Sequence, residues 1–235
     1  MTVYFGNILK HCTSLACTEL EESFLASALH DETLSNHAEF KNGKAKITAE
    51  WGLNRFADTV ALLGSNWATG RLRVESGGAA VYDSPVASGG RNSIIRLPGL
   101  FMVSEMELEL ESVGKLEIGI LYAGRGLRLP LFCEGFKYGL NANGKAERTA
   151  YGAVYGRKLP PLRTFEMAFS GIDNAQKAAM EEYIDAVQYV VPHLVEPYGS
   201  GIFPPLYATL TAAGSFEKQS GGFLWNTSLQ YMEAR

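Results

Sequence analysis

Cysteine is scarce in this sequence, with three among 235 residues. Cys12, Cys17 and Cys133 make an odd number, which does not suit a disulfide framework. The Cys-x4-Cys spacing of the first two lacks the second pair of ligands that a structural zinc site requires. We therefore expect buried free thiols. A metal or reactive-thiol role for His11 beside Cys12 is the alternative.

Long apolar runs and an excess of basic charge are also missing. No uninterrupted stretch reaches the roughly 18 apolar residues that a membrane helix needs, and residues 1–10 carry no apolar core. We expect neither a membrane span nor a signal peptide. The formal net charge is −4, and acidic and basic residues are spread evenly along the chain. No basic face is indicated, so no nucleic-acid partner is expected.

Catalytic motifs are absent as well. The sequence has no Gly-x-Ser-x-Gly elbow, no Gly-x-x-x-x-Gly-Lys-Ser/Thr phosphate loop and no Asp-x-Asp-x-Asp calcium loop. The four histidines, His11, His30, His37 and His193, lie in ordinary contexts. We therefore expect no enzyme activity, no catalytic residue, no cofactor and no metal. A carboxylate pair that hydrolyses glycans leaves no short motif and stays as an alternative.

Alternation of apolar and polar residues is the clearest pattern present. Residues 44–50 (KAKITAE) have the period of two that is typical of a half-buried strand. Further strands are predicted at 59–64, 71–75, 105–111, 116–120, 127–131, 165–169, 206–210 and 225–231. The closely spaced strands between 105 and 131 predict an antiparallel sheet with one wet face. Residues 15–35 predict only short helical turns or loop around a few buried leucines.

Two local patterns carry more detail. Glu105, Glu107, Glu109 and Glu111 alternate with apolar residues, which predicts a solvated face that needs water or a cationic partner, because aligned glutamates repel each other. One strong helix is predicted at about 174–190. Asp173 and Gln176 form a capping-box pattern before it, and Pro192 stops it.

These elements predict a mainly β protein. An antiparallel β-sandwich with an irregular N-terminal segment is expected in residues 1–134. An α+β domain with one main helix is expected in residues 135–235.

Aromatic residues and arginine supply the candidate contact sites. Tyrosine and arginine are enriched at protein interfaces, and aromatic rings also stack on sugars. The alternative is a tyrosine-rich sheet surface. The predicted glycan or interface contacts are Trp51, Trp67, Tyr82, Arg91 and Asn92 of the loop 88–92, Tyr138, Tyr151, Tyr155 and Arg157.

Several stretches together resemble a known family. Residues 58–74 (DTVALLGSNWATGRLRV) resemble the early strands of galactose-binding-like jelly rolls, and 106–110 (MELEL) with 116–124 (LEIGILYAG) resemble their closing strands. The C-terminal part, including 165–170 (FEMAFS) and 223–235 (FLWNTSLQYMEAR), is similar to the ends of siphophage distal tail and minor tail proteins.

The resemblance implies a structural role in a bacteriophage virion. A homo-oligomeric ring or connector at the tail tip or baseplate would join the tail tube to the hub, fibres or receptor-binding proteins. The protein would be made in the host cytoplasm and would then be located in the virion. The cysteines do not match the pattern of iron–sulfur minor tail proteins, so no cofactor is carried over. The alternative function is a carbohydrate-binding module that contacts a host cell-surface glycan.

Overall fold

The computed structural model divides the chain into two compact units. Unit 1 contains Met1–Arg128 and His193–Tyr207, and unit 2 contains Leu129–Pro192 and Ala208–Ala234. The structure describes residues 1–31, 34, 36–129, 135–142, 144–148, 150–151, 154–197, 205–219 and 221–234, without the side chains of 54, 144–148 and 154–158.

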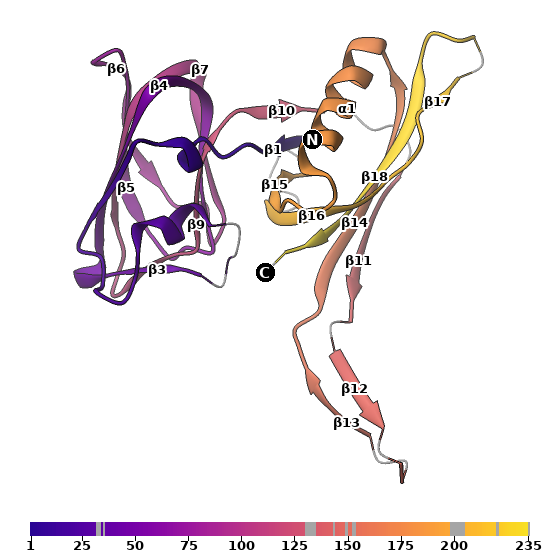
Figure 1. Cartoon of the computed structure of the whole chain (residues 1–235), viewed down its shortest axis with the longest axis horizontal. Coiled ribbons are helices and arrows are strands. Elements are labelled where there is room, and N and C mark those ends of the chain that lie inside the picture. The colour runs from indigo at the N-terminus through magenta and orange to yellow at the C-terminus, as the bar shows by residue number, and fades with distance from the viewer. Residues whose placement is uncertain are drawn as a thin grey trace. The chain divides into compact units, whose positions relative to one another are not determined.

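A six-stranded antiparallel sheet forms the body of unit 1. Its order is β2-β4-β7-β5-β6, and β9 also pairs with β4 (Figure 1). The predicted mainly β class is confirmed. The strands are β2 (Ser14–Thr18), β4 (Lys44–Leu63), β5 (Thr69–Ser76), β6 (Ala79–Ala87), β7 (Ser93–Glu111) and β9 (Ile120–Gly124).

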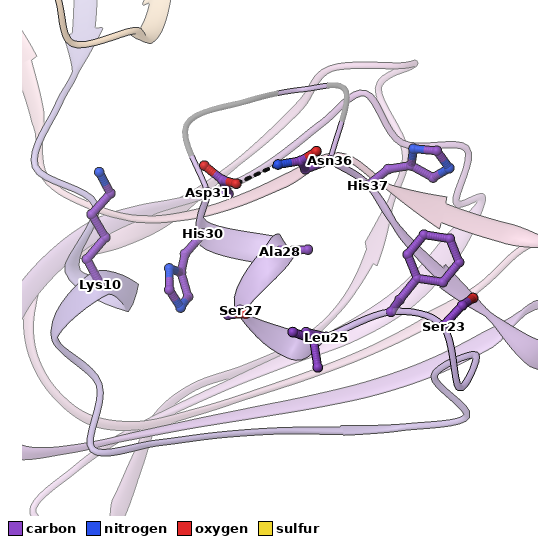
Figure 2. A pocket seen from close by; sticks show the side chains of 10 residues that line it. Lys10, Ser23, Leu25, Ser27, Ala28, His30, Asp31, Asn36 and His37 are labelled. Carbon is purple, nitrogen blue, oxygen red and sulfur yellow. Dashed lines mark hydrogen bonds between the residues drawn. The ribbon is translucent and has the colours of Figure 1, made fainter.

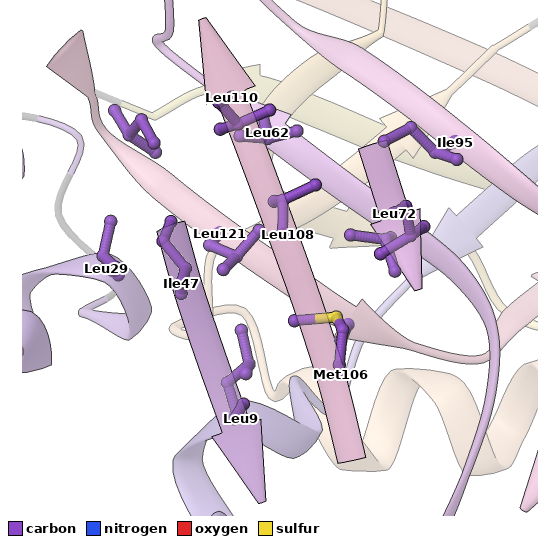
Figure 3. Packing of buried hydrophobic residues seen from close by; sticks show 14 of the residues in the cluster. Leu9, Leu29, Ile47, Leu62, Leu72, Ile95, Met106, Leu108, Leu110 and Leu121 are labelled. Carbon is purple, nitrogen blue, oxygen red and sulfur yellow. The ribbon is translucent and has the colours of Figure 1, made fainter. Parts of the chain in front are cut away.

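The two longest strands, β4 and β7, bend where their ladder is irregular. Register shifts lie between Glu50 and Arg55 and between Ala57 and Thr59, and such bulges bend a strand. The strands predicted at 44–50 and 59–64 are therefore two halves of one strand. Both halves contribute to one buried cluster (Figure 3). Its members include Ile47, Leu62, Leu72, Leu108, Leu110 and Leu121.

The strands predicted between 105 and 131 exist in part, but they do not pair with one another as expected. β8 (Leu116–Ile118) pairs with β3 (Ala38–Phe40), and β9 pairs with β4. β10 (Gly126–Arg128) pairs with β1 (Thr2–Tyr4). Period-two patterning identifies a strand but contains no information about its partner. The expected local sheet of sequence neighbours was wrong for that reason.

The acidic row of β7 lies on the solvent face, as predicted, and neighbouring strands supply its cationic partners. In the ladder, Glu109 lies between Lys46 of β4 and Arg71 of β5. The Lys46 Nζ atom lies 2.7 Å from Glu107 and 3.6 Å from Glu109. Lys44 Nζ lies 3.0 Å from Glu111. Exposed pairs of this kind contribute little to stability individually, but they remove the repulsion that the row would otherwise cause.

A buried polar group is present where β1 pairs with β15 (His193–Glu196). The Tyr4 hydroxyl donates to Glu196 Oε2 over 3.1 Å, and the Arg96 guanidinium pairs with both oxygens of the same carboxylate. Glu196 is only 7% exposed. Its charge is retained inside the protein because a hydroxyl and a guanidinium compensate it.

The N-terminal segment of unit 1 is irregular, as expected, although strand β2 within it was not predicted. Its short 3-10 helices are η1 (Ile8–His11), η2 (Ala26–His30) and η3 (Lys41–Gly43). Cys12 and Cys17 are free, half-buried thiols, and burial raises the pKa of Cys17 to about 11. Cys133 lies outside the described residues.

Unit 2 combines an antiparallel sheet with one helix. The sheet order is β16-β18-β14-β11, and β17 also pairs with β18. A separate two-stranded ribbon is formed by β12 and β13. The strands are β11 (Phe136–Asn141), β12 (Gly144–Arg148), β13 (Val154–Lys158), β14 (Leu162–Ile172), β16 (Leu206–Ala213), β17 (Glu217–Lys218) and β18 (Trp225–Glu233).

The predicted helix is confirmed as α1 (Asn174–Val187). Asp173 and Gln176 form the expected reciprocal capping box. The helix ends earlier than Pro192 predicts, because Gln188 adopts the left-handed conformation that closes a helix C-terminus. α1 contacts the sheet through a buried hydrogen bond of 3.0 Å from the Tyr183 hydroxyl to the Tyr231 hydroxyl.

The predicted division into 1–134 and 135–235 stays a prediction about independently folding domains. The compact units differ from it in two respects. Unit 2 already begins at Leu129, and His193–Tyr207 belongs with unit 1. Among the described residues, no helix is both long and apolar enough to cross a membrane.

Candidate functional site

A cavity of about 750 Å³ lies in unit 1 beside η2. The segment 23–31 provides most of its wall, and Lys10, Asn36 and His37 complete it. Figure 2 shows Lys10 and His30 on one side and His37 on the other, with Asp31 and Asn36 between them. Several polar side chains therefore line one hollow.

Backbone contacts hold this segment against the sandwich. Leu29 of η2 is completely buried and belongs to the hydrophobic core. The Glu21 amide donates to the Glu39 carbonyl over 2.9 Å, and the Lys41 amide donates to the Glu19 carbonyl over 2.6 Å. An irregular segment fixed at both ends and by a buried leucine can present its polar side chains in a defined arrangement.

The position of Lys10 is set by the cap of η1. The Asn7 side chain accepts a hydrogen bond from the Leu9 amide over 3.2 Å. The same side chain donates to the Leu121 carbonyl of β9 and accepts from the Ala123 amide. One asparagine thus starts the short helix and ties it to the core strand behind it.

An aromatic pair forms the apolar part of the cavity wall. The rings of Phe24 and His37 lie 5.7 Å apart with an interplanar angle of 38°. His37 is held from behind, because its Nε2 atom lies 3.0 Å from Glu39 Oε1. Leu25 adds apolar surface that is 73% exposed.

The polar part of the wall is centred on Asp31. Its Oδ2 atom accepts a hydrogen bond of 2.7 Å from Asn36 Nδ2, as Figure 2 shows. A carboxylate has about four acceptor positions, and an amide also has an acceptor oxygen, so both groups retain capacity for a ligand. His30 and Lys10 add an imidazole and an ammonium group.

A group with metal-binding potential adjoins this cavity. One ligand atom from each of His37, Glu39 and Glu117 lies within 4.8 Å of the others. Lys115 also pairs with Glu39, which lowers the pKa of that carboxyl through hydrogen bonds from Lys115 and His37. His37 belongs to both the cavity and this group.

The prediction of glycan or interface contacts was wrong for two residues. Trp51 and Trp67 are 5% and 2% exposed, so they pack in the core and have no ring face available to a glycan. Trp51 uses its indole N–H for the Ile8 carbonyl over 2.8 Å. Large aromatic rings are the side chains that gain most from burial, and composition alone does not separate that role from sugar stacking.

The other predicted residues of unit 1 do not line the cavity. Tyr82 is half-buried on β6, and Arg91 is exposed. Asn92 has a structural role, because its side chain accepts from the Gly64 amide and donates to the Pro205 carbonyl, each over 3.0 Å. Asn92 therefore ties the loop that contains it to two other segments of unit 1.

The predicted residues of unit 2 are surface groups where they are described. Tyr138 is 46% exposed and Tyr151 is 99% exposed. The side chains of Tyr155 and Arg157 lie outside the described residues. The interface role of this set stays a prediction.

Sequence reasoning missed the cavity residues, which lie in the stretch with the least regular pattern. The available signal was the density of short polar and aromatic residues there, namely Phe24, His30, Asp31, Asn36 and His37. Histidine, asparagine and aspartate are common next to turns, so none of them marks a binding site in the sequence. Their position around one cavity becomes visible only in the folded structure.

No protein-family model and no curated protein matches this sequence. Solved structures with a similar arrangement include SpGH29, with 13% identity and a TM-score of 0.46, over 52% of this chain and 28% of that chain. The family 32 CBM from C. perfringens NanJ in complex with galactose has 12% identity and a TM-score of 0.43, over 52% and 98%. The lectin domain of lectinolysin complexed with Lewis B antigen has 12% identity and a TM-score of 0.44, over 52% and 99%.

Proposed function

We propose that unit 1 binds carbohydrate in the cavity beside η2. The observation that carries this proposal is the combination of the Phe24 ring with an amide, a carboxylate and an imidazole around one hollow. A sugar presents hydroxyl groups that donate and accept hydrogen bonds, and a C–H face that packs on an aromatic ring. The wall supplies a counterpart for each of these features.

The size of the cavity suits the terminal residues of a glycan chain. At about 750 Å³ it falls within the range of about 300–1,000 Å³ that is typical of small-ligand sites. Asp31 and Asn36, already joined by a hydrogen bond, would orient the hydroxyl groups. A prearranged pair loses less conformational entropy when a ligand binds.

The residues favour binding over hydrolysis. Glycosidases use two carboxyl groups about 5–10 Å apart across the scissile bond. Asp31 is the one carboxylate among the described residues that line the cavity. A single carboxylate tied to an asparagine acts as a hydrogen-bond acceptor for a ligand.

A glycan array with the full chain tests this proposal. The expected result is selective binding to a restricted set of glycans, which an Asp31→Ala variant loses while its far-ultraviolet circular dichroism is unchanged. A His11→Gln variant is the matched control, because His11 lies outside the cavity lining. If the folded wild-type protein binds no glycan, or binds equally with and without Asp31, the proposal fails.

We also infer a role in a bacteriophage tail, as the resemblance implied. The supporting observation is the ribbon of β12 and β13, which in the described part of the chain pair only with each other. Figure 1 shows this ribbon beyond the ends of β11 and β14. A lone two-stranded ribbon is marginally stable in water, and its open edges favour pairing with another chain.

In this role the chain is a structural component of the tail tip or baseplate. It forms a ring or connector with copies of itself and with other tail proteins, and the cavity contacts a host-surface glycan. A head-to-tail contact whose rotation closes generates such a ring. The protein is accordingly located in the virion after synthesis in the host cytoplasm.

Mass photometry tests the assembly role. The full chain, alone or mixed with tail proteins encoded beside it, is expected to form a defined ring or hetero-complex. Replacing residues 143–159 with a short glycine–serine turn should reduce it to a monomer, because the ribbon supplies the pairing edge. Phe24→Ala is the control and should assemble normally. A wild type that stays monomeric in every mixture, or a shortened variant that assembles like the wild type, would contradict this role.

A further inference from the structure

We propose that His37, Glu39 and Glu117 form a zinc site in unit 1. One nitrogen and two carboxylate oxygens from these residues lie within 4.8 Å of one another. An imidazole with two carboxylates is a ligand set that zinc accepts, with a fourth position left for water. This inference is independent of the proposed glycan binding, although His37 is common to both groups.

The sheet itself creates a need for positive charge at this point. Glu39 of β3 and Glu117 of β8 are direct cross-strand partners. Their Cα atoms are therefore close, and like charges in that position destabilise a strand pair. Lys115 offsets part of this repulsion through its pair with Glu39, and a divalent cation between the two carboxylates would attract both of them.

The contacts around Glu39 leave one of its oxygens directed at the histidine. Lys115 Nζ pairs with Oε2, while Oε1 lies 3.0 Å from His37 Nε2. In tetrahedral zinc sites, bonds of about 2.0–2.1 Å place neighbouring ligand atoms about 3.3 Å apart. Small side-chain rotations would thus let zinc replace the proton between Nε2 and Oε1. Lys115 would then orient the ligand from outside, as second-layer partners of metal ligands do.

The strand that carries Glu117 is held in place by Asn66. Its side chain donates to the Lys115 carbonyl and accepts from the Glu117 amide, each over 2.8 Å. The Asn66 amide also donates to the Glu117 carbonyl over 3.2 Å. A braced backbone of this kind reduces the rearrangement needed for the carboxylate to meet an ion.

Titration calorimetry with zinc, and cobalt(II) absorbance as a second probe, test the site in the metal-free full chain. We expect one zinc per chain and a higher thermal midpoint with zinc present. Glu117→Gln and His37→Gln should each weaken zinc binding by at least about tenfold, since each removes a ligand.

Two matched histidine variants serve as controls. His11→Gln, beside Cys12, and His30→Gln, in the cavity, should both bind zinc like the wild type. Absence of zinc binding, zinc binding undiminished in Glu117→Gln, or its loss in His11→Gln would each overturn the proposal. Glu117→Gln separates the two proposals. It should weaken zinc binding but leave glycan binding unchanged, because Glu117 is not among the described residues that line the cavity.

Discussion

The folded structure is expected to be lost as the pH rises from about 10 to about 12. Burial, with the neighbouring Glu196 carboxylate, raises the pKa of Tyr4 from 10.0 to about 12. Because its pKa is higher in the folded than in the unfolded state, Tyr4 contributes fully to the free energy of unfolding below pH 10. This contribution disappears as the pH rises through 12. At about 1.4 kcal/mol per pKa unit, this one residue contributes about 3 kcal/mol.

Three further tyrosines also make the folded state less stable as the pH rises. Burial raises the pKa values of Tyr122, Tyr183 and Tyr231. The Tyr122 hydroxyl lies 3.1 Å from the Phe5 carbonyl oxygen and 3.3 Å from that of Arg125, and these two acceptors, which share its one proton, would repel a phenolate. Domains are stable by only about 5–15 kcal/mol in total, so ionisation of these groups together suffices to unfold both units.

Phenolate absorbance and circular dichroism measured across the alkaline range check this prediction. The buried tyrosines should ionise together with the loss of secondary structure. Tyr4→Phe should make the stability of unit 1 less dependent on pH in this range. Tyr189→Phe is the matched control, because Tyr189 is 46% exposed. Ionisation of Tyr4, Tyr122, Tyr183 and Tyr231 near pH 10, with the fold intact, would contradict the raised pKa values of these buried hydroxyls.

A Phe24→Ala variant is expected to bind its glycan at least about tenfold more weakly than the wild type. Removing the ring leaves the hydrogen-bonding groups in place but takes away the surface on which the sugar packs. An aromatic contact of about 1.4 kcal/mol corresponds to a tenfold change in the dissociation constant. Calorimetric titration with the glycan that the array selects gives both affinities.

Phe56→Ala is the matched control for this variant. Phe56 also lies in unit 1 and is 55% exposed, but it is not part of the cavity lining. Its removal should leave the affinity unchanged. Equal losses in the two variants would indicate a general effect on folding, and an unchanged affinity in Phe24→Ala would remove the ring from the binding site.

The sequence predicted those elements whose patterns depend on local physics. The alternation in 44–50 and 105–111 follows from one buried and one solvated face, and both segments are strands. Asp173 and Gln176 predicted the start of α1 because a capping box acts within three residues. The end of α1 was misjudged, since the left-handed Gln188 has no strong sequence signal.

Contacts between distant segments were beyond such patterns. Nothing near Leu116 indicates that β8 pairs with β3, or that Glu39 meets Glu117 there. The cavity has the same origin, because Lys10 and Asp31 line one hollow only after η1 and η2 are both anchored on the core. Residue type alone also misled the prediction for the two buried tryptophans, since an aromatic ring that could stack on a sugar can also fill a core.

Backbone amide NMR spectra recorded during titration with the selected glycan locate the binding site residue by residue. The signals that shift first and furthest are expected to belong to residues 23–31, Asn36 and His37, with unit 2 unaffected. Shifts confined to the loop of Arg91 and Asn92 or to Tyr138 and Tyr151, or no shifts at all, would contradict carbohydrate binding in this cavity.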